Sequence, residues 1–203
     1  TDARRPDAEI TGLLTRLAQR PTPAVVWYGS DGGRVELSGR VSENWIAKTA
    51  NLLVDDLGLM PGDRVVLDPA LHWRTLVLAA AAWRTGACVV LEPTVGDVRL
   101  SALLDRTGAA ADALPSPEGS AAAAVAEAED RLILAYPALA MRLPDDSVLE
   151  PGDIDYCAEI RSHGDRWSGA SRPADADAAL KTSGGSLSFA ELRDQAEARA
   201  AEL

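Results

Sequence analysis

The densest group of ligand-type side chains lies between residues 153 and 165, where Asp153, Asp155, Glu159, His163 and Asp165 follow one another closely. On a helix, Asp155 and Glu159 would lie one turn apart, as would Glu159 and His163. One face would then offer oxygen and imidazole ligands to a hard divalent cation. The spacing matches no recognised ligand pattern, and the solvated face of an acidic helix explains it more simply. We therefore predict no metal site.

A second candidate chemistry is nucleophilic catalysis by Cys157 with His163 as its base. The sequence places no third group that would orient the histidine. Cys157 also shares helical spacing with Ile154 and Ile160, which favours a core position. We predict no catalytic residue, and we expect Cys157 and the distant Cys88 to be buried free thiols.

His72 precedes an apolar helix, just beyond the end of a strand that closes at Leu67. Open parallel sheets bind ligands at such strand ends, so His72 could contact a ligand. A histidine without a partner is weak support for a site, and hydrogen bonding to loop carbonyls is the favoured interpretation. A small-molecule site at the ends of the Leu67 and Leu91 strands stays open as a weaker alternative.

Tryptophans could line a pocket for an acyl or aryl group. Trp45 and Trp83 occupy the apolar stripes of their predicted helices, which favours the core for both. Trp27 lies in a short apolar strand. Trp73 and Trp167 are less constrained by the pattern.

The elements that would position these residues begin with a helix over 10–17, which stops before Pro21. Two short strands, 24–28 and 34–37, flank a turn of Gly, Ser and Asp residues and predict a β-hairpin. Ser38 or Ser42 then caps a long helix that Gly58 ends in a left-handed conformation.

The middle of the chain predicts a right-handed βαβ crossover. Strand 64–67, the largely buried helix 70–85 and strand 87–91 follow in order, so that both strands lie parallel in one sheet. Further elements are expected in a less regular stretch. The first is a helix from Asp97 that ends at Gly108 and carries Val98, Leu100, Leu103 and Leu104. A strand over 109–113, a helix over 121–129 and a strand over 131–136 follow. The last two are a helix from Asp153 to about Ser162 and a helix from about Ser188.

The sequence thus predicts an α/β fold with a largely parallel sheet flanked by helices and an antiparallel hairpin near the N-terminus. We expect one partial domain over residues 1–203, with a subdivision at 115–130 and a surface linker over 168–177. The chain ends while its last predicted helix continues, so we expect the natural product to be longer or its tail to be missing here.

Charge and hydropathy exclude two classes of partner. Acidic residues outnumber basic ones by 31 to 20, giving a net charge of −11 that repels a phosphate backbone, so we predict no nucleic-acid partner. The longest apolar run, 76–83, is far shorter than the ~18 to 20 residues that cross a bilayer, so we predict no membrane partner. With no signal-peptide pattern, we expect a cytoplasmic protein.

The segment 24–93 resembles the amino-terminal region of adenylate-forming enzymes: the acyl-CoA synthetases, luciferases and peptide-synthetase adenylation domains. The run Leu57-Gly58-Leu59-Met60-Pro61-Gly62-Asp63-Arg64-Val65 matches that family's "Leu-Gly-x-x-Pro-Gly-Asp-x-Val". An Ala-rich helix then closes in Gly86-Ala87 and leads through an apolar strand to Pro93. The resemblance is good over about seventy residues, thin from 108 to 170, and returns at 176–203.

The resemblance also implies a phosphate-binding loop. The family's loop reads Thr-Ser-Gly-Thr-Thr-Gly-x-Pro-Lys, and Thr182, Ser183 and Gly184 match its start, with Gly185 and Ser186 in place of the following residues. Such a loop presents backbone N–H groups and hydroxyls to phosphate, with a lysine as counter-charge. Its proline and final lysine are missing here, and Lys181 would have to point the wrong way along its strand to replace that lysine.

Two functions follow from the resemblance. The first is a degenerate acyl-CoA synthetase-like protein that acts as a binding or interaction module, because the family's nucleotide motifs and the small domain with the adenylation lysine are absent from this sequence. The second is an ATP-dependent acid–CoA ligase or adenylating enzyme completed by missing sequence or by a partner chain. Its cofactor would be ATP or AMP with Mg, and its ligand a small carboxylate or acyl group.

Overall fold

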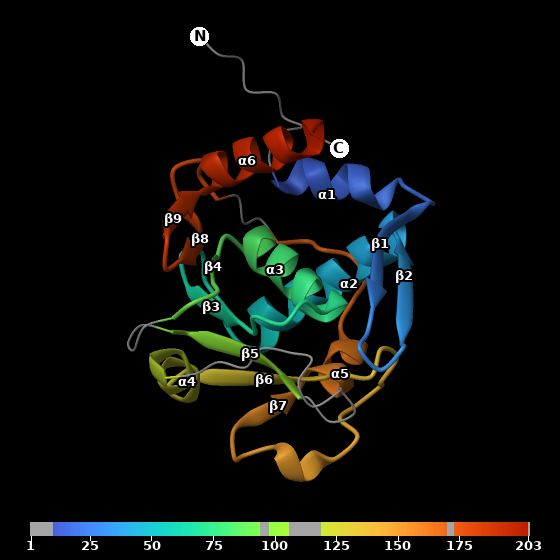
Figure 1. Cartoon of the computed structure of the whole chain (residues 1–203), viewed down its shortest axis with the longest axis vertical. Helices are drawn as coiled ribbons and strands as arrows, with labels where there is room; N and C mark the ends of the chain where they lie inside the picture. The colour runs from blue at the N-terminus through green and yellow to red at the C-terminus, as the bar shows by residue number, and fades with distance from the viewer. Residues whose placement is uncertain (1–9, 94–97, 106–118, 170–172, 203) are drawn as a thin grey trace.

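A computed structural model describes residues 10–93, 98–105, 119–169 and 173–202. For residues 119–121, only the main chain is described. Figure 1 shows a curved sheet with its helices on both sides. The strands are β1 (Pro23–Tyr28), β2 (Arg34–Ser38), β3 (Arg64–Leu67), β4 (Cys88–Val90), β5 (Leu100–Asp105), β6 (Asp130–Ala135), β7 (Asp153–Asp155), β8 (Ala178–Thr182) and β9 (Gly185–Ser188). The helices are α1 (Ile10–Ala18), α2 (Gly39–Asn51), α3 (Trp73–Thr85), α4 (Gly119–Ala126), α5 (Tyr156–Glu159) and α6 (Phe189–Ala201), with short turns η1 (Leu52–Asp56), η2 (Asp146–Val148) and η3 (Ile160–Ser162).

The amino-terminal part follows the sequence prediction closely. β1 and β2 form a separate antiparallel hairpin. Ser38 caps α2, since its side chain accepts a hydrogen bond from the amide of Val41. The helix continues through η1, a π-helical turn, and the chain leaves it at Gly58 with a φ of 62°. The predicted Ser38 cap and left-handed glycine are confirmed.

The main sheet has seven strands in the order β7-β6-β5-β3-β4-β8-β9. Every neighbouring pair in it is parallel except β8 and β9, which are antiparallel. α3 connects β3 to β4 and ends at Gly86 in a left-handed conformation, as the βαβ pattern predicted. The predicted fold class is confirmed.

The two faces of the sheet are covered unequally. Alternate residues of β3 face opposite sides: Val65 and Leu67 join the main core with α2 and α3, whereas Val66 joins a small cluster with Val90 and Val125 of α4. Figure 1 shows α3 and α4 on opposite sides of the strands. Because both faces are covered, β3 and β4 read as continuous apolar runs.

Two expected helices are wrong. The residues from Val98 to Leu104 were assigned to a helix, but Leu100–Asp105 is strand β5, paired in parallel with β3 and β6. The expected helix from Asp153 begins instead with strand β7, and only α5 and η3 follow as helical turns. In both places, apolar residues at helical spacing also fit a strand buried on both faces.

Other expectations fall partly outside the described residues. The predicted strand 109–113 lies outside them, and so do residues 170–172 of the predicted linker and 115–118 of the predicted subdivision. The helix expected over 121–129 corresponds to α4, and the strand expected over 131–136 to β6. Across the described part of the chain, none of the helices combines the length and the apolar character that crossing a bilayer requires.

Candidate functional site

The parallel strands place the candidate site at their carboxyl edge. The chain leaves β3 into α3, which covers one face of the sheet. It leaves β5 toward α4, which covers the other face and precedes β6 in the sequence. The point between β3 and β5 is therefore a topological switch, where open α/β sheets bind their ligands. The residues that follow these strands are the first candidates for ligand contact.

Asp68 and Asp105 carry the carboxylates at this switch point. Asp68 is buried, and its two oxygens accept hydrogen bonds from the amides of Ala70 at 2.9 Å and Leu104 at 3.0 Å. Asp68 thus ties the end of β3 to β5. Asp105 is the last residue of β5 and is half-buried. The sequence pattern did not indicate this pair, because the apolar residues before Asp105 also fit helical spacing.

His72 caps α3 and is fully engaged by main-chain groups. Its Nδ1 accepts from the amide of Arg74 at 3.1 Å, so the ring proton lies on Nε2, which donates to the carbonyl of Tyr136 at 3.1 Å. Burial, with the nearby Arg74 cation, lowers the pKa of His72 to about 4. The neutral ring binds a loop carbonyl, which confirms the favoured interpretation.

The hairpin closes over the same edge. The Trp27 ring meets His72 edge-on at a centroid distance of 4.5 Å, and its Nε1 donates to the carbonyl of Leu71 at 2.9 Å. At the hairpin tip, the amide and the hydroxyl of Ser30 both lie 2.7 Å from the hydroxyl of Tyr136. Aromatic rings and satisfied polar groups therefore fill the space beyond β6.

Arg74 fixes the chain that leaves β6. Its side chain is buried, and its guanidinium donates to the carbonyls of Ala135 at 2.9 Å, Pro137 at 3.1 Å and Ala140 at 3.0 Å. The cation also lies 4.5 Å from the ring centroid of Trp73. Burial lowers the pKa of Arg74. The guanidinium acts as a structural clamp on residues 135–140.

The remaining tryptophans pack inside the molecule. Trp45 and Trp73 meet edge-on at 5.2 Å, and Trp45 and Trp83 pack against the main core, as their helical stripes predicted. Trp73 is 3% exposed, so it is a core residue too.

The predicted phosphate loop has a different geometry. The resemblance implies a phosphate loop that leads into the helix from about Ser188, but Thr182 ends β8 and Gly185 begins β9. Ser183 and Gly184 form the turn of a tight hairpin. Ser186 lies in β9, opposite Lys181. β9 is short and consists mainly of Gly and Ser, so its alternation of apolar and polar residues is too weak to predict a strand from the sequence.

The turn amides already have partners within the chain. The amide of Ser183 donates to the Glu92 carboxylate at 2.6 Å, and the amide of Gly184 donates to the Thr182 hydroxyl at 3.2 Å. The Ser183 hydrogen bonds lower the pKa of Glu92. Glu92 is 91 positions away in sequence, so sequence reasoning could not foresee this contact.

The acidic group at 153–165 is dispersed. Asp153 pairs with Arg131 at 2.6 Å, and the Asp155 carboxylate caps α5 through the amides of Cys157 and Ala158. Glu159 and Asp165 are exposed, and His163 Nε2 lies 3.2 Å from Asp56. Among the described residues, no three His, Cys, Asp or Glu side chains are grouped so that they could hold a metal ion.

Cys157 and His163 are engaged separately. Cys157 is a buried free cysteine in the main core, and burial raises the pKa of its thiol, which confirms the predicted core position. His163 faces Asp56, and its carbonyl accepts from the Lys48 ammonium. Cys88 is also buried and free, as expected.

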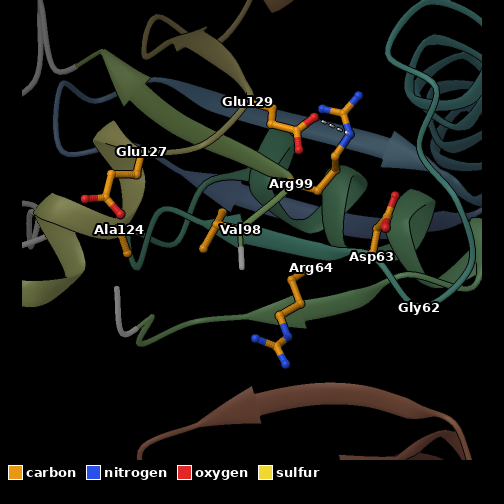
Figure 2. Close-up of a pocket in the computed structure, with 8 residues that line it drawn as sticks. All are labelled: Gly62, Asp63, Arg64, Val98, Arg99, Ala124, Glu127 and Glu129. Atoms are coloured by element: carbon orange, nitrogen blue, oxygen red, sulfur yellow. Dashed lines mark ion pairs between the residues drawn. The ribbon is translucent and has the colours of Figure 1, made fainter. Parts of the chain in front are cut away.

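A polar cavity of about 410 Å³ opens at the opposite, amino edge of the sheet. Figure 2 shows Arg64 and Arg99 pointing away from each other there, with Glu127 just after α4 and Glu129 before β6. Arg99 is committed to Asp130, to Glu129 at 3.3 Å and to the carbonyl of Leu57. Its guanidinium joins the starts of β5 and β6 to the end of η1, which is a structural role.

Comparison with known proteins gives one curated relative. The chain is 34% identical over 145 residues to a TIGR03089 family protein of Mycobacterium tuberculosis (strain ATCC 25618 / H37Rv). The match covers 71% of this chain and 55% of the relative, so the chain spans about half the length of the curated relative it matches. No protein-family model matches the chain.

Solved structures show the fold. A Brucella canis acyl-CoA synthetase superposes with a TM-score of 0.60 at 18% identity, over 86% of this chain and 31% of its own. The anthranilate CoA ligase AuaEII in complex with anthranoyl-AMP gives 0.57 at 15% identity, over 88% and 33%. A Mycobacterium tuberculosis fatty acyl CoA synthetase gives 0.53 at 15%, over 88% and 33%. The chain thus has the fold of part of an acyl-CoA synthetase.

Proposed function

We propose that this chain is a degenerate acyl-CoA synthetase-like protein that serves as a binding or interaction module and does not adenylate a carboxylate by itself. The observation that carries this proposal is the 2.6 Å hydrogen bond from the Ser183 amide to the Glu92 carboxylate. That amide is the group a phosphate oxygen would need at the turn.

An entering phosphate would have to displace Glu92 and approach its negative charge. Glu92 is negatively charged at neutral pH, and its hydrogen bonds with Ser183 lower its pKa further. The neighbouring amide of Gly184 is taken by the Thr182 hydroxyl, and Lys181 is held within β8. A two-residue hairpin turn therefore lacks both the open amides and the terminal cation of a phosphate loop.

The other polar groups at the carboxyl edge support the same proposal. His72, Asp68 and Arg74 make their hydrogen bonds with main-chain groups of the chain itself. Both ring nitrogens of His72 are used in this way, so His72 would have to give up a bond to hold a nucleotide. Buried polar groups that are already satisfied favour a structural role.

A second candidate is ATP-dependent carboxylate adenylation completed by further sequence or by a partner chain. It is favoured by the superposition, in which this chain corresponds to only 31% of the Brucella canis enzyme. Thr182, Ser183 and Gly184 would then hold the phosphates of ATP or AMP with Mg, with Gly185 and Ser186 completing the loop. The substrate would be a small carboxylate or acyl compound.

Thermal unfolding with ATP·Mg, AMP and CoA separates the two candidates. A ligand at a hundred times its dissociation constant adds ~2.7 kcal/mol to stability. We expect no shift with any of the three. A shift with ATP that disappears in Thr182→Val and persists in Thr15→Val, a control in α1, would show that the turn does hold a phosphate, which is the premise that the first proposal denies. Carboxylate-dependent pyrophosphate exchange would establish the second.

A further inference from the structure

A groove of about 390 Å³ lies between α1 and α6, with Trp83 of α3 in its lining. Figure 1 shows these two helices side by side, although they come from opposite ends of the chain. We propose that this groove is a binding site for a neutral aromatic small molecule, separate from the carboxyl edge of the sheet.

The walls of the groove are apolar. α1 contributes Ile10 and Leu13, and Leu13 is 53% exposed although it faces a partly enclosed space. α6 contributes Phe189, Leu192 and Ala196, which share one side of the helix because they are three and four residues apart. None of the described residues of α6 is buried, so its apolar side is available to a ligand.

The groove is held open by contacts on both sides. α6 begins with a capping box between Ser188 and Glu191, and the amide of Phe189 donates to the carbonyl of Asp177 at 3.0 Å. The Trp83 Nε1 donates to the carbonyl of Ala179 at 2.8 Å, which fixes the indole ring. α1 is anchored by Leu14, which is 3% exposed. A preformed groove binds without the entropic cost of ordering its walls.

The charges in the lining indicate a neutral ligand. Arg16 and Arg193 face the groove together with Asp175 and Glu197, so two positive groups are matched by two negative ones. Arg193 is also paired with Asp175 at 3.4 Å. Among the described lining residues, a charged ligand would therefore meet like charge as well as opposite charge, and it would lose hydration on entering.

The volume of the groove and the aromatic side chains in its lining indicate the class of ligand more closely. The volume falls within the ~300 to 1,000 Å³ of small-molecule pockets. Trp83 and Phe189, the single phenylalanine of the chain, both line the groove. Two aromatic side chains favour an aromatic ligand that can stack or meet them edge-on.

This inference does not rest on the proposed function, because the groove shares no residue with the turn at 182–186 or with the carboxyl-edge cluster. Nucleotide titrations test those residues, and the groove is tested with an uncharged dye. Failure of one proposal is therefore distinguishable from failure of the other.

The experiment is a fluorescence titration of the whole chain with N-phenyl-1-naphthylamine, a neutral aromatic probe. We expect saturable binding that Ala196→Trp, which fills the groove, weakens at least tenfold. Ala198→Trp is the matched control, because Ala198 is exposed on the same helix outside the groove lining. It should bind like the unmodified chain, and circular dichroism melting should show both variants folded.

Competition defines the ligand class. Naphthalene should displace the probe at concentrations at which 2-naphthoate and decanol do not. Non-saturable binding, equal weakening by both tryptophan variants, or equal competition by 2-naphthoate or decanol would overturn the proposal. The proposal would also be overturned if the wild-type chain were a dimer that binds no probe and the Ala196→Trp variant were a monomer. The groove would then serve self-association.

Discussion

The Nε2 of His72 lies 3.1 Å from the carbonyl oxygen of Tyr136 and donates its proton there, which joins the start of α3 to the end of β6. The same ring accepts from the Arg74 amide through Nδ1. Only the neutral imidazole can make both bonds, because a protonated ring has no acceptor nitrogen. The contact between α3 and β6 therefore depends on pH.

We expect the free energy of unfolding to fall as the pH is lowered from about 6.5 to about 4. The pKa of His72 is lowered from 6.5 to about 4, so in this window the unfolded chain binds a proton that the folded chain excludes. At about 1.4 kcal/mol per unit, the loss reaches roughly 3 kcal/mol below the folded pKa. Urea unfolding at pH 7 and at pH 4.5 measures it.

His72→Asn keeps a capping side chain and removes the titration, so its stability should depend less on pH across that window. Leu71→Ala, at the neighbouring position and 90% exposed, is the control and should keep the wild-type dependence. Parallel pH profiles for His72→Asn and the wild type would contradict the assignment.

Replacing Arg74 should be severely destabilising. Arg74→Met leaves three main-chain carbonyls, those of Ala135, Pro137 and Ala140, without their donor. We expect a loss of about 3 to 5 kcal/mol, from unpaired buried acceptors and lost packing. Denaturant unfolding measures it, with Arg142→Met at an exposed position as control, where the change should stay within about 0.5 kcal/mol.

The hydroxyls of Thr49 and Tyr156 lie 2.7 Å apart in the core, and Thr49 also donates to the carbonyl of Trp45. Tyr156→Phe should cost about 1 kcal/mol, the usual net value of such a bond. In a double-mutant cycle with Thr49→Val, the two losses should not add, since both remove the same contact. Strict additivity would mean that the hydroxyls do not interact in solution.

Leu53 tests the packing of the main core. Leu53 is a residue of η1, and its side chain is 0% exposed. It packs in the main core, to which α2 and α3 also contribute. Leu53→Ala should cost about 2 to 5 kcal/mol through lost burial and a cavity. Leu71→Ala is the control, because Leu71 is 90% exposed and its truncation should change the free energy of unfolding by no more than about 0.5 kcal/mol.

Local signals in the sequence were sufficient for the α/β class, the hairpin, the βαβ unit, the Ser38 cap and the glycine at 58. Each depends on residues within a few positions of one another, where side-chain and backbone sterics act directly. The strand at 100–105 could not be recognised in this way. A strand buried on both faces loses the polar alternation that distinguishes it from a helix, and only its neighbours β3 and β6 decided its conformation.

The candidate site was decided by tertiary structure. The types and order of Thr182, Ser183 and Gly184 indicated a phosphate loop, but pairing of β8 with β9 put Thr182 at the end of a strand and made Ser183 and Gly184 a hairpin turn. The parallel sheet then brought Glu92 to the Ser183 amide across 91 positions of chain. Sequence alone determined which groups were available for chemistry, whereas the fold determined which of them bond to one another, because hydrogen bonds form between groups close in space whatever their separation along the chain.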